Sequence, residues 1–143
     1  MAGYGRDNHE RNLYSMLNDK SPEYWFMISK HDSESANSLL AINGYADIII
    51  YHYHQAVEKL LKGYCIQESI TFPFIHDLER LYSLLSKKSP KYVGVDEQII
   101  ILNNYSNQLR YPESDNLSIE DAKDAKNLFC ELSEHLSSCS KNC

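Results

Sequence analysis

The chain has 143 residues, which is close to the usual size of one domain. Hydrophobic residues make up 43% of it and charged residues 24%, with only 5 glycines and 4 prolines, so a wholly disordered or fibrous chain is excluded. Fourteen basic residues stand against twenty acidic ones, and this net charge of −6 disfavours a protein whose whole surface clamps long nucleic acid. No stretch approaches the roughly 18 apolar residues of a membrane span, and the first residues lack an apolar signal core. We therefore expect a cytoplasmic protein of one domain.

The first half of the chain predicts an arm and two helices. Residues 1–20 are polar with a weak apolar pattern, which indicates a loose arm or a short helix. A helix begins after Ser21, because a hydroxyl cap precedes a proline and a carboxylate, and it ends at Asn43-Gly44. The next helix has the clearest pattern, with apolar residues at spacings of three and four: Ala46, Ile49, Ile50, Tyr53, Val57, Leu60, Leu61 and Tyr64. We expect this helix to be central to the core.

The second half predicts three more helices. A segment containing Pro73 interrupts the pattern, and a helix with apolar residues from Leu78 to Leu85 follows it. Another helix covers 95–109. A last one begins at Ser118, which forms a capping box with Asp121. Five amphipathic helices and no convincing strand predict an all-α bundle over residues 21–137, with a tail at 138–143.

Common enzyme motifs are absent from the sequence, which has no P-loop, G-x-G-x-x-G, H-E-x-x-H or G-x-S-x-G. Cys65 and Cys130 are interpreted as small apolar residues on helices, because the four cysteines form no C-x-x-C pair. His135, Cys139 and Cys143 would align only if the last helix reached the C-terminus, and the serine-rich end is a poor helix former. We therefore expect neither a metal nor a cofactor.

The polar face of the second predicted helix has two interpretations. It carries Gln55, Glu58, Lys59 and Lys62. It is either an ordinary solvated face with a Glu58–Lys62 ion pair one turn apart, or a cationic site for an anion. The local pattern alone favours the solvated face.

Three sequence blocks together resemble the HEPN domain family, named for higher eukaryotes and prokaryotes nucleotide-binding. They are the run Tyr51-His52-Tyr53-His54-Gln55-Ala56-Val57-Glu58-Lys59-Leu60-Leu61-Lys62-Gly63, then His76-Asp77-Leu78, then Arg110-Tyr111-Pro112. The resemblance covers about residues 21–137. It implies an up-and-down antiparallel bundle of four long helices plus a shorter fifth, commonly a homodimer, with a polar groove for nucleotides or RNA.

Carried over by position, the resemblance implies a ligand-binding site made of polar residues from all three blocks: His52, Gln55, Lys59, Lys62, His76, Arg110 and Tyr111. The lysines and Arg110 would supply cations for phosphate, and Tyr111 a ring for a base. His76 opens a helix, where backbone N–H groups favour an anion. Alternatively, Glu58 neutralises the lysines and the groove is structural.

The chain departs from the ribonucleases of that family, which carry an arginine and, after roughly four to six residues, a histidine that can act as acid or base. Arg110 is followed by Tyr111-Pro112-Glu113-Ser114-Asp115-Asn116-Leu117, and no other arginine has a histidine at that spacing. We therefore expect no catalytic residues of this type, and a protein that is not an enzyme.

Three functions follow from these observations. The favoured one is a non-catalytic module that binds a nucleotide and acts with a minimal nucleotidyltransferase, as in a toxin–antitoxin pair. That enzyme's Gly-Ser nucleotide-loop motif is missing here, so the partner would act in trans. The second is an atypical metal-independent ribonuclease in which His52 or His76 replaces the missing histidine. The third is a structural dimerisation module.

Overall fold

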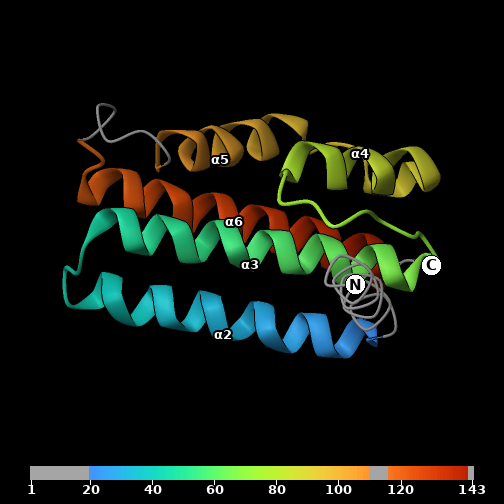
Figure 1. Cartoon of the computed structure of the whole chain (residues 1–143), viewed down its shortest axis with the longest axis horizontal. Helices are drawn as coiled ribbons and strands as arrows, with labels where there is room; N and C mark the ends of the chain where they lie inside the picture. The colour runs from blue at the N-terminus through green and yellow to red at the C-terminus, as the bar shows by residue number, and fades with distance from the viewer. Residues whose placement is uncertain (1–19, 110–115, 142–143) are drawn as a thin grey trace, which may run out of the picture.

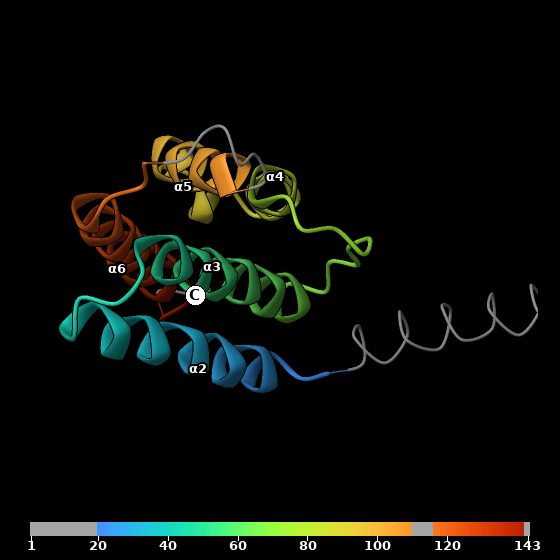
Figure 2. The same cartoon turned by 60° about the vertical axis from the view of Figure 1, so that its left-hand side comes forward.

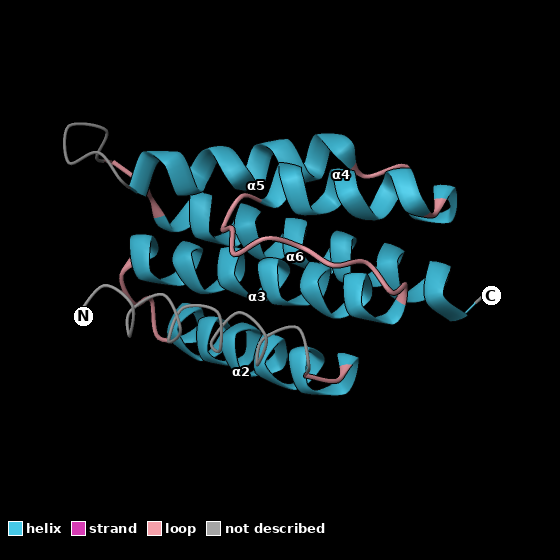
Figure 3. Cartoon of the chain, turned by 45° about the vertical axis from the view of Figure 1, so that its right-hand side comes forward, coloured by secondary structure: helices cyan, strands magenta, loops and turns pink. Residues whose placement is uncertain are grey.

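The computed structural model describes residues 20–109 and 116–141 of the chain. Its elements follow one another as α2 (Pro22–Ala41), α3 (Ala46–Gln67), α4 (Leu78–Lys88), the short 3-10 helix η1 (Pro90–Tyr92), α5 (Asp96–Leu109) and α6 (Ile119–Lys141). Figure 3 shows that the regular elements in this part of the chain are all helices. The predicted arm, apart from Lys20, lies outside the described residues, as do Arg110 and Tyr111.

The predicted helix starts are confirmed by their capping contacts. The Ser21 hydroxyl accepts a hydrogen bond from the Tyr24 backbone N–H at 3.2 Å, with Pro22 at the first helical position. The Asp121 backbone N–H donates to the Ser118 hydroxyl at 3.2 Å, and the Asp121 carboxylate accepts from the Ser118 N–H at 2.8 Å. This reciprocal pair is the predicted capping box.

The bundle has three layers (Figures 1 and 2). Helices α3 and α6 lie in the middle, α2 covers one side of them, and α4 and α5 cover the other. The four long helices α2, α3, α5 and α6 alternate in direction, and the loop after α3 runs back along the bundle before the shorter α4 begins. The expected up-and-down bundle with a shorter fifth helix is therefore confirmed. Among the described helices, none is both long and apolar enough to cross a membrane.

Helix α3 is central, as its apolar pattern predicts, and it contacts α2, α4, α5 and α6. Its side chains Ile49, Ile50, Tyr53, Val57 and Leu61 are completely buried. Burying each such side chain contributes about 1.5–3 kcal/mol before the entropic cost of ordering it. The core therefore fixes the rotation of α3, and with it the directions of the polar residues.

The last helix continues to Lys141, beyond the expected tail boundary at residue 137. Its final turns are tied to the chain around η1. The Cys139 thiol donates to the Lys91 carbonyl at 2.8 Å, and Nε2–H of His135 donates to the Val93 carbonyl at 3.1 Å. These tertiary contacts outweigh the weak helix propensity of the serine-rich end. In the described part of the chain, no three metal-binding side chains come together.

The cysteines differ in burial. Cys65 is buried in α3, and burial raises the pKa of its thiol to about 12. Cys130 is exposed on α6. Cys65 thus behaves as the small apolar residue that the sequence predicts, whereas Cys130 faces solvent.

Candidate ligand-binding site

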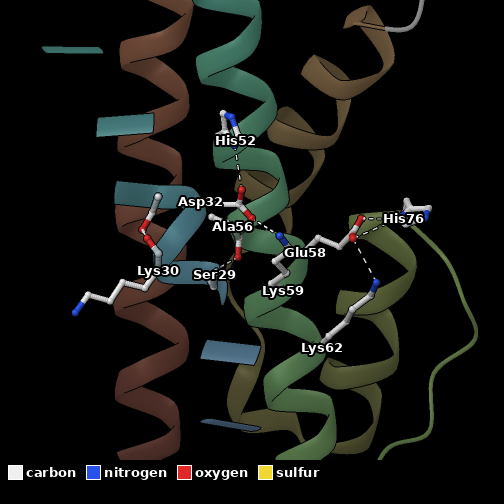
Figure 4. A network of polar contacts seen from close by, with 10 residues as sticks. Ser29, Lys30, Asp32, His52, Ala56, Glu58, Lys59, Lys62 and His76 are labelled. Atoms are coloured by element: carbon white, nitrogen blue, oxygen red, sulfur yellow. Dashed lines mark hydrogen bonds and ion pairs between the residues drawn. The ribbon is translucent and has the colours of Figure 1, made fainter. Parts of the chain in front are cut away.

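The polar residues of α3 separate into two groups that face different neighbours (Figure 4). His52 and Lys59 are seven residues apart, on the side of the helix that faces α2. Glu58 and Lys62 are one turn apart, on the side that faces the loop before α4. Since positions four and seven residues apart lie on one helix face, the sequence spacing itself produces both groups.

On the α2 side, His52 and Lys59 share the carboxylate of Asp32. Nδ1 of His52 lies 3.0 Å from Oδ1 of Asp32, and the Lys59 ammonium forms an ion pair with Oδ2. The Asp32 side chain is only 14% exposed. The two expected ligand contacts therefore hold α2 against α3, and Asp32 balances the charge of Lys59.

On the side that faces the loop before α4, a buried carboxylate joins two expected site residues. Glu58 is 2% exposed and Lys62 is 5% exposed. The Lys62 ammonium lies 3.3 Å from Oε2 of Glu58, and Nδ1 of His76 lies 3.2 Å from each carboxylate oxygen. The predicted Glu58–Lys62 ion pair is confirmed, but the interpretation of this face as solvated is wrong, because the loop before α4 covers it.

Aromatic rings surround the Lys62 ammonium. It lies 5.5 Å from the ring of Trp25, 5.9 Å from that of Phe72 and 6.0 Å from that of Phe74. Rings at these distances attract a cation through their electron-rich faces. The charge of Lys62 is thus satisfied by Glu58 and the rings, and the ammonium is almost inaccessible to a ligand.

A pocket of about 370 Å³ lies where α3, α5 and the loop before α4 meet. We call it the α3–α5 pocket; its lining residues are Tyr51, His54, Gln55, His76, Ser106 and Leu109. It brings Gln55 and His76, from two of the three sequence blocks, into one cavity. The third block begins with Arg110, directly after Leu109 in the chain.

A family model described as HEPN domain matches residues 22–138. The chain belongs to the HEPN domain family. The match spans α2 to α5 completely and nearly all of α6. No curated protein and no solved structure matches the chain significantly. Membership of the HEPN family supports a general nucleotide-related or ribonuclease-like function.

The N-terminus of α4 in this HEPN domain differs from the sequence-based expectation. We expected its backbone N–H groups to favour an anion beside His76. Instead, the Asp77 carboxylate accepts from the Glu79 N–H at 3.0 Å, and Oδ1 of Asn103 accepts from the Leu78 N–H at 3.3 Å. The N–H groups of Leu78 and Glu79 therefore already have protein partners.

Several pocket residues escaped the sequence analysis. Tyr51 is 50% exposed and lies one helical turn before Gln55. This spacing places both residues on the same face of α3, so the position of Gln55 also predicted Tyr51 as a site residue. Ser106 and Leu109 come from α5, and only the packing of α5 beside α3 places them here. The burial of Asp32 was signalled by its position on the apolar stripe of α2 with Ile28 and Ala36.

Proposed function

We propose that this HEPN protein binds a nucleotide or a similar phosphate ligand in the α3–α5 pocket and performs no catalysis itself. One observation carries the proposal. Two residues that the HEPN resemblance selects from separate blocks, Gln55 and His76, line the same cavity, and the chain continues from its Leu109 into Arg110.

The chemistry of the lining supports a ligand of this kind. A volume of about 370 Å³ falls within the range of small-molecule sites, roughly 300–1,000 Å³. The half-exposed ring of Tyr51 offers a surface on which a base can stack. The Gln55 amide has both donors and acceptors for a base edge, and His76 can donate to phosphate.

The expected lysine contacts play a different part in this proposal. Lys59 is held by Asp32 on the α2 side, together with His52, and Lys62 is buried beside Glu58. We propose that Gln55 and His76 contact the ligand directly, with Arg110 and Tyr111 as further contacts from the third block. Arginine is suited to this role because its planar fork binds two phosphate oxygens.

A melting series tests the proposal. The purified chain is heated with ATP, GTP, their diphosphates or a short RNA, each with and without Mg²⁺. A ligand at about one hundred times its Kd adds about 2.7 kcal/mol of stability, which is several degrees in Tm for a domain of this size.

Two variants and their matched controls locate the site. Arg110→Ala and His76→Ala should reduce the nucleotide-dependent shift, whereas the exposed Arg80→Ala and His31→Ala should keep it in full. Equal shifts in all four variants would show that the nucleotide does not bind in the α3–α5 pocket. No shift with any compound would contradict the proposed function and favour the structural dimerisation module.

We also propose that the chain forms a homodimer and acts with a minimal nucleotidyltransferase in trans, as in a toxin–antitoxin pair. Exposed apolar side chains near the α2–α3 turn, Ile42, Tyr45 and Ile48, support a protein contact. The net charge of −6 suits a protein partner better than long RNA. Light scattering across a concentration series tests the dimer, and a monomer at every concentration would contradict it.

A second function, metal-independent RNA cleavage, is supported by the place of one histidine. His76 lines the pocket that also contains Leu109, the residue before Arg110, whereas His52 is paired with Asp32 of α2. Cleavage of end-labelled RNA in EDTA tests it. Cleavage lost in His76→Ala and Arg110→Ala but kept in His52→Ala would support His76 as the acid or base. No cleavage by the wild-type chain would contradict this function.

A further inference from the structure

His76 is a surface side chain that is held at one end. Its side chain is 58% exposed, yet Nδ1 lies 3.2 Å from both oxygens of Glu58, whose own side chain is 3% exposed. An exposed side chain ordinarily samples several rotamers. A buried carboxylate in this position restricts the ring to the rotamers that keep this contact.

The backbone beside His76 is fixed separately, by α5. The amide of Asn103, a buried residue, donates to the Asp77 carboxylate and to the Glu79 carboxylate, at 3.0 Å each. Its Oδ1 accepts from the Leu78 N–H at 3.3 Å. These contacts fix the position of the residues directly after His76. The His76 side chain can then still rotate about its own bonds, and the contact with Glu58 restricts that rotation.

Glu58 remains a buried carboxylate because Lys62 accompanies it. An isolated buried charge is costly, whereas a paired and hydrogen-bonded one is tolerated. The Lys62 ammonium supplies the opposite charge at 3.3 Å, and the rings of Trp25, Phe72 and Phe74 accommodate that ammonium. Figure 4 shows Glu58 between Lys62 and His76, which it contacts through the same carboxylate.

We propose that Glu58 is a positioning residue: its carboxylate, held by Lys62, accepts a hydrogen bond from Nδ1–H of His76 and thereby directs the other ring nitrogen, Nε2, to a ligand in the α3–α5 pocket. There Nε2 accepts a hydrogen bond when the ring is neutral and donates one to phosphate when the ring is protonated. The role in ligand binding rests on the proposed function, but the orientation of the ring does not. Lys62 acts through Glu58 and touches no ligand. In the same way, carboxylates behind metal-bound histidines set which ring nitrogen is protonated.

The test replaces the buried pair as a unit, because removing Glu58 alone would leave Lys62 buried without its carboxylate. Replacing a buried ion pair by apolar residues of similar size is often neutral for stability. The variant Glu58→Leu/Lys62→Met is compared with Lys30→Met/Glu34→Leu, which removes an exposed pair from α2. Circular dichroism and melting confirm that each variant is folded.

The first readout needs no ligand. The ¹⁵N chemical shifts of the His76 ring, identified by their loss in His76→Ala, report which nitrogen carries the proton when the ring is neutral. Nδ1–H should predominate in the wild-type chain and in the Lys30/Glu34 control, and Nε2–H in the Glu58/Lys62 variant. An unchanged tautomer in that variant would overturn the proposal. If that variant does not fold, Glu58→Gln serves instead, because a neutral amide holds Nδ1–H less firmly and should lower its share.

The second readout is a double-mutant cycle in the Kd for ATP and for GTP. Removing the pair should weaken binding about tenfold, the lower range for loss of a supporting carboxylate. In a His76→Ala background it should cause no further loss, since Glu58 acts through His76. A further loss there would mean that Lys62 touches the ligand, and would overturn the proposal. If the wild-type chain binds neither nucleotide, the proposed function fails, and the tautomer still decides the role of Glu58.

Discussion

Oδ1 of Asp32 on α2 lies 3.0 Å from Nδ1 of His52 on α3. The other carboxylate oxygen of Asp32 forms an ion pair with the Lys59 ammonium. Asp32 is 20 residues from His52 and 27 from Lys59 in the chain, so these contacts fasten one helix to the next. Two residues that the family resemblance selects for a ligand, His52 and Lys59, are thereby bound to the protein itself. They face Asp32 of α2, whereas Glu58 faces His76 in the loop before α4.

Replacing Asp32 should therefore destabilise the bundle without affecting the pocket. Asp32→Ala removes the acceptor of two polar contacts and leaves Lys59 partly buried without its carboxylate, which should cost about 1–3 kcal/mol. Thermal melting measures the loss. Glu34→Ala, which breaks an exposed pair with Lys30, is the control and should change stability by at most about 0.5 kcal/mol. Unchanged stability together with weaker nucleotide binding would instead place His52 and Lys59 in the ligand site.

A charge inside the core face of α3 should unfold the domain. Val57 is completely buried, so Val57→Asp places a carboxylate among apolar side chains at a cost of several kcal/mol, against a typical total stability of about 5–15 kcal/mol. Circular dichroism and gel filtration would detect the unfolding. Ile100→Asp, at an exposed position of α5, is the control and should remain folded. A folded Val57→Asp with a wild-type Tm would contradict the orientation of α3.

The sequence predicts the fold well because the signals that define the helices, their caps and their apolar spacing, are local. Ser21 and Ser118 cap their helices, and the apolar spacing from Ile49 to Leu61 fixes which face of α3 is buried. The site is less predictable because its contacts join distant segments. Nothing within α3 shows that the loop before α4 covers Glu58, so a buried ion pair had the sequence pattern of a solvated one.

The same limit applies to the pocket residues of α5 and to the end of α6. Ser106 and Leu109 line the pocket only because α5 packs beside α3, which spacing along one helix cannot indicate. The last turns of α6 form because Cys139 and His135 contact carbonyl groups more than 40 residues away, at 48 and 42 positions. Local propensity describes neither relationship.

The close approach of α2 to α3 depends on Gly63. A Cβ atom at this position would lie 2.5 Å from Cε1 of Phe26 and 3.1 Å from Cβ of Trp25. Gly63→Ala should therefore destabilise the protein by about 1–3 kcal/mol, even though alanine is the better helix former by about 1 kcal/mol. Urea unfolding measures the change. Adding Phe26→Leu should recover part of the loss by freeing space, and a single Gly63→Ala variant more stable than wild type would contradict this packing.

The contact between Glu68 and Tyr92 should make stability depend on pH in the acidic range. The Tyr92 hydroxyl donates to Oε2 of Glu68 at 2.7 Å, and the Lys91 ammonium lies 3.1 Å from the same oxygen. The hydrogen bond from Tyr92 lowers the pKa of Glu68 below its usual value of 4.5, and Lys91 lowers it further, against the opposing effect of burial. Because the pKa is lower in the folded chain, the ionised carboxylate stabilises the fold above pH 4.5, and this contribution disappears as the pH falls through the lowered folded value.

Glu68→Gln should consequently lower the stability by about 1–3 kcal/mol at pH 7, where wild-type Glu68 is ionised and accepts a charged hydrogen bond. Urea unfolding of both proteins from pH 7 down to pH 3 measures the difference, which should shrink steadily below about pH 4.5. Tyr92→Phe removes the donor, and in that background Glu68→Gln should cost less at pH 7, because the two groups act on one another. A difference between wild type and Glu68→Gln that stays constant across this range would show that the carboxylate gains nothing from Tyr92 and Lys91 on folding.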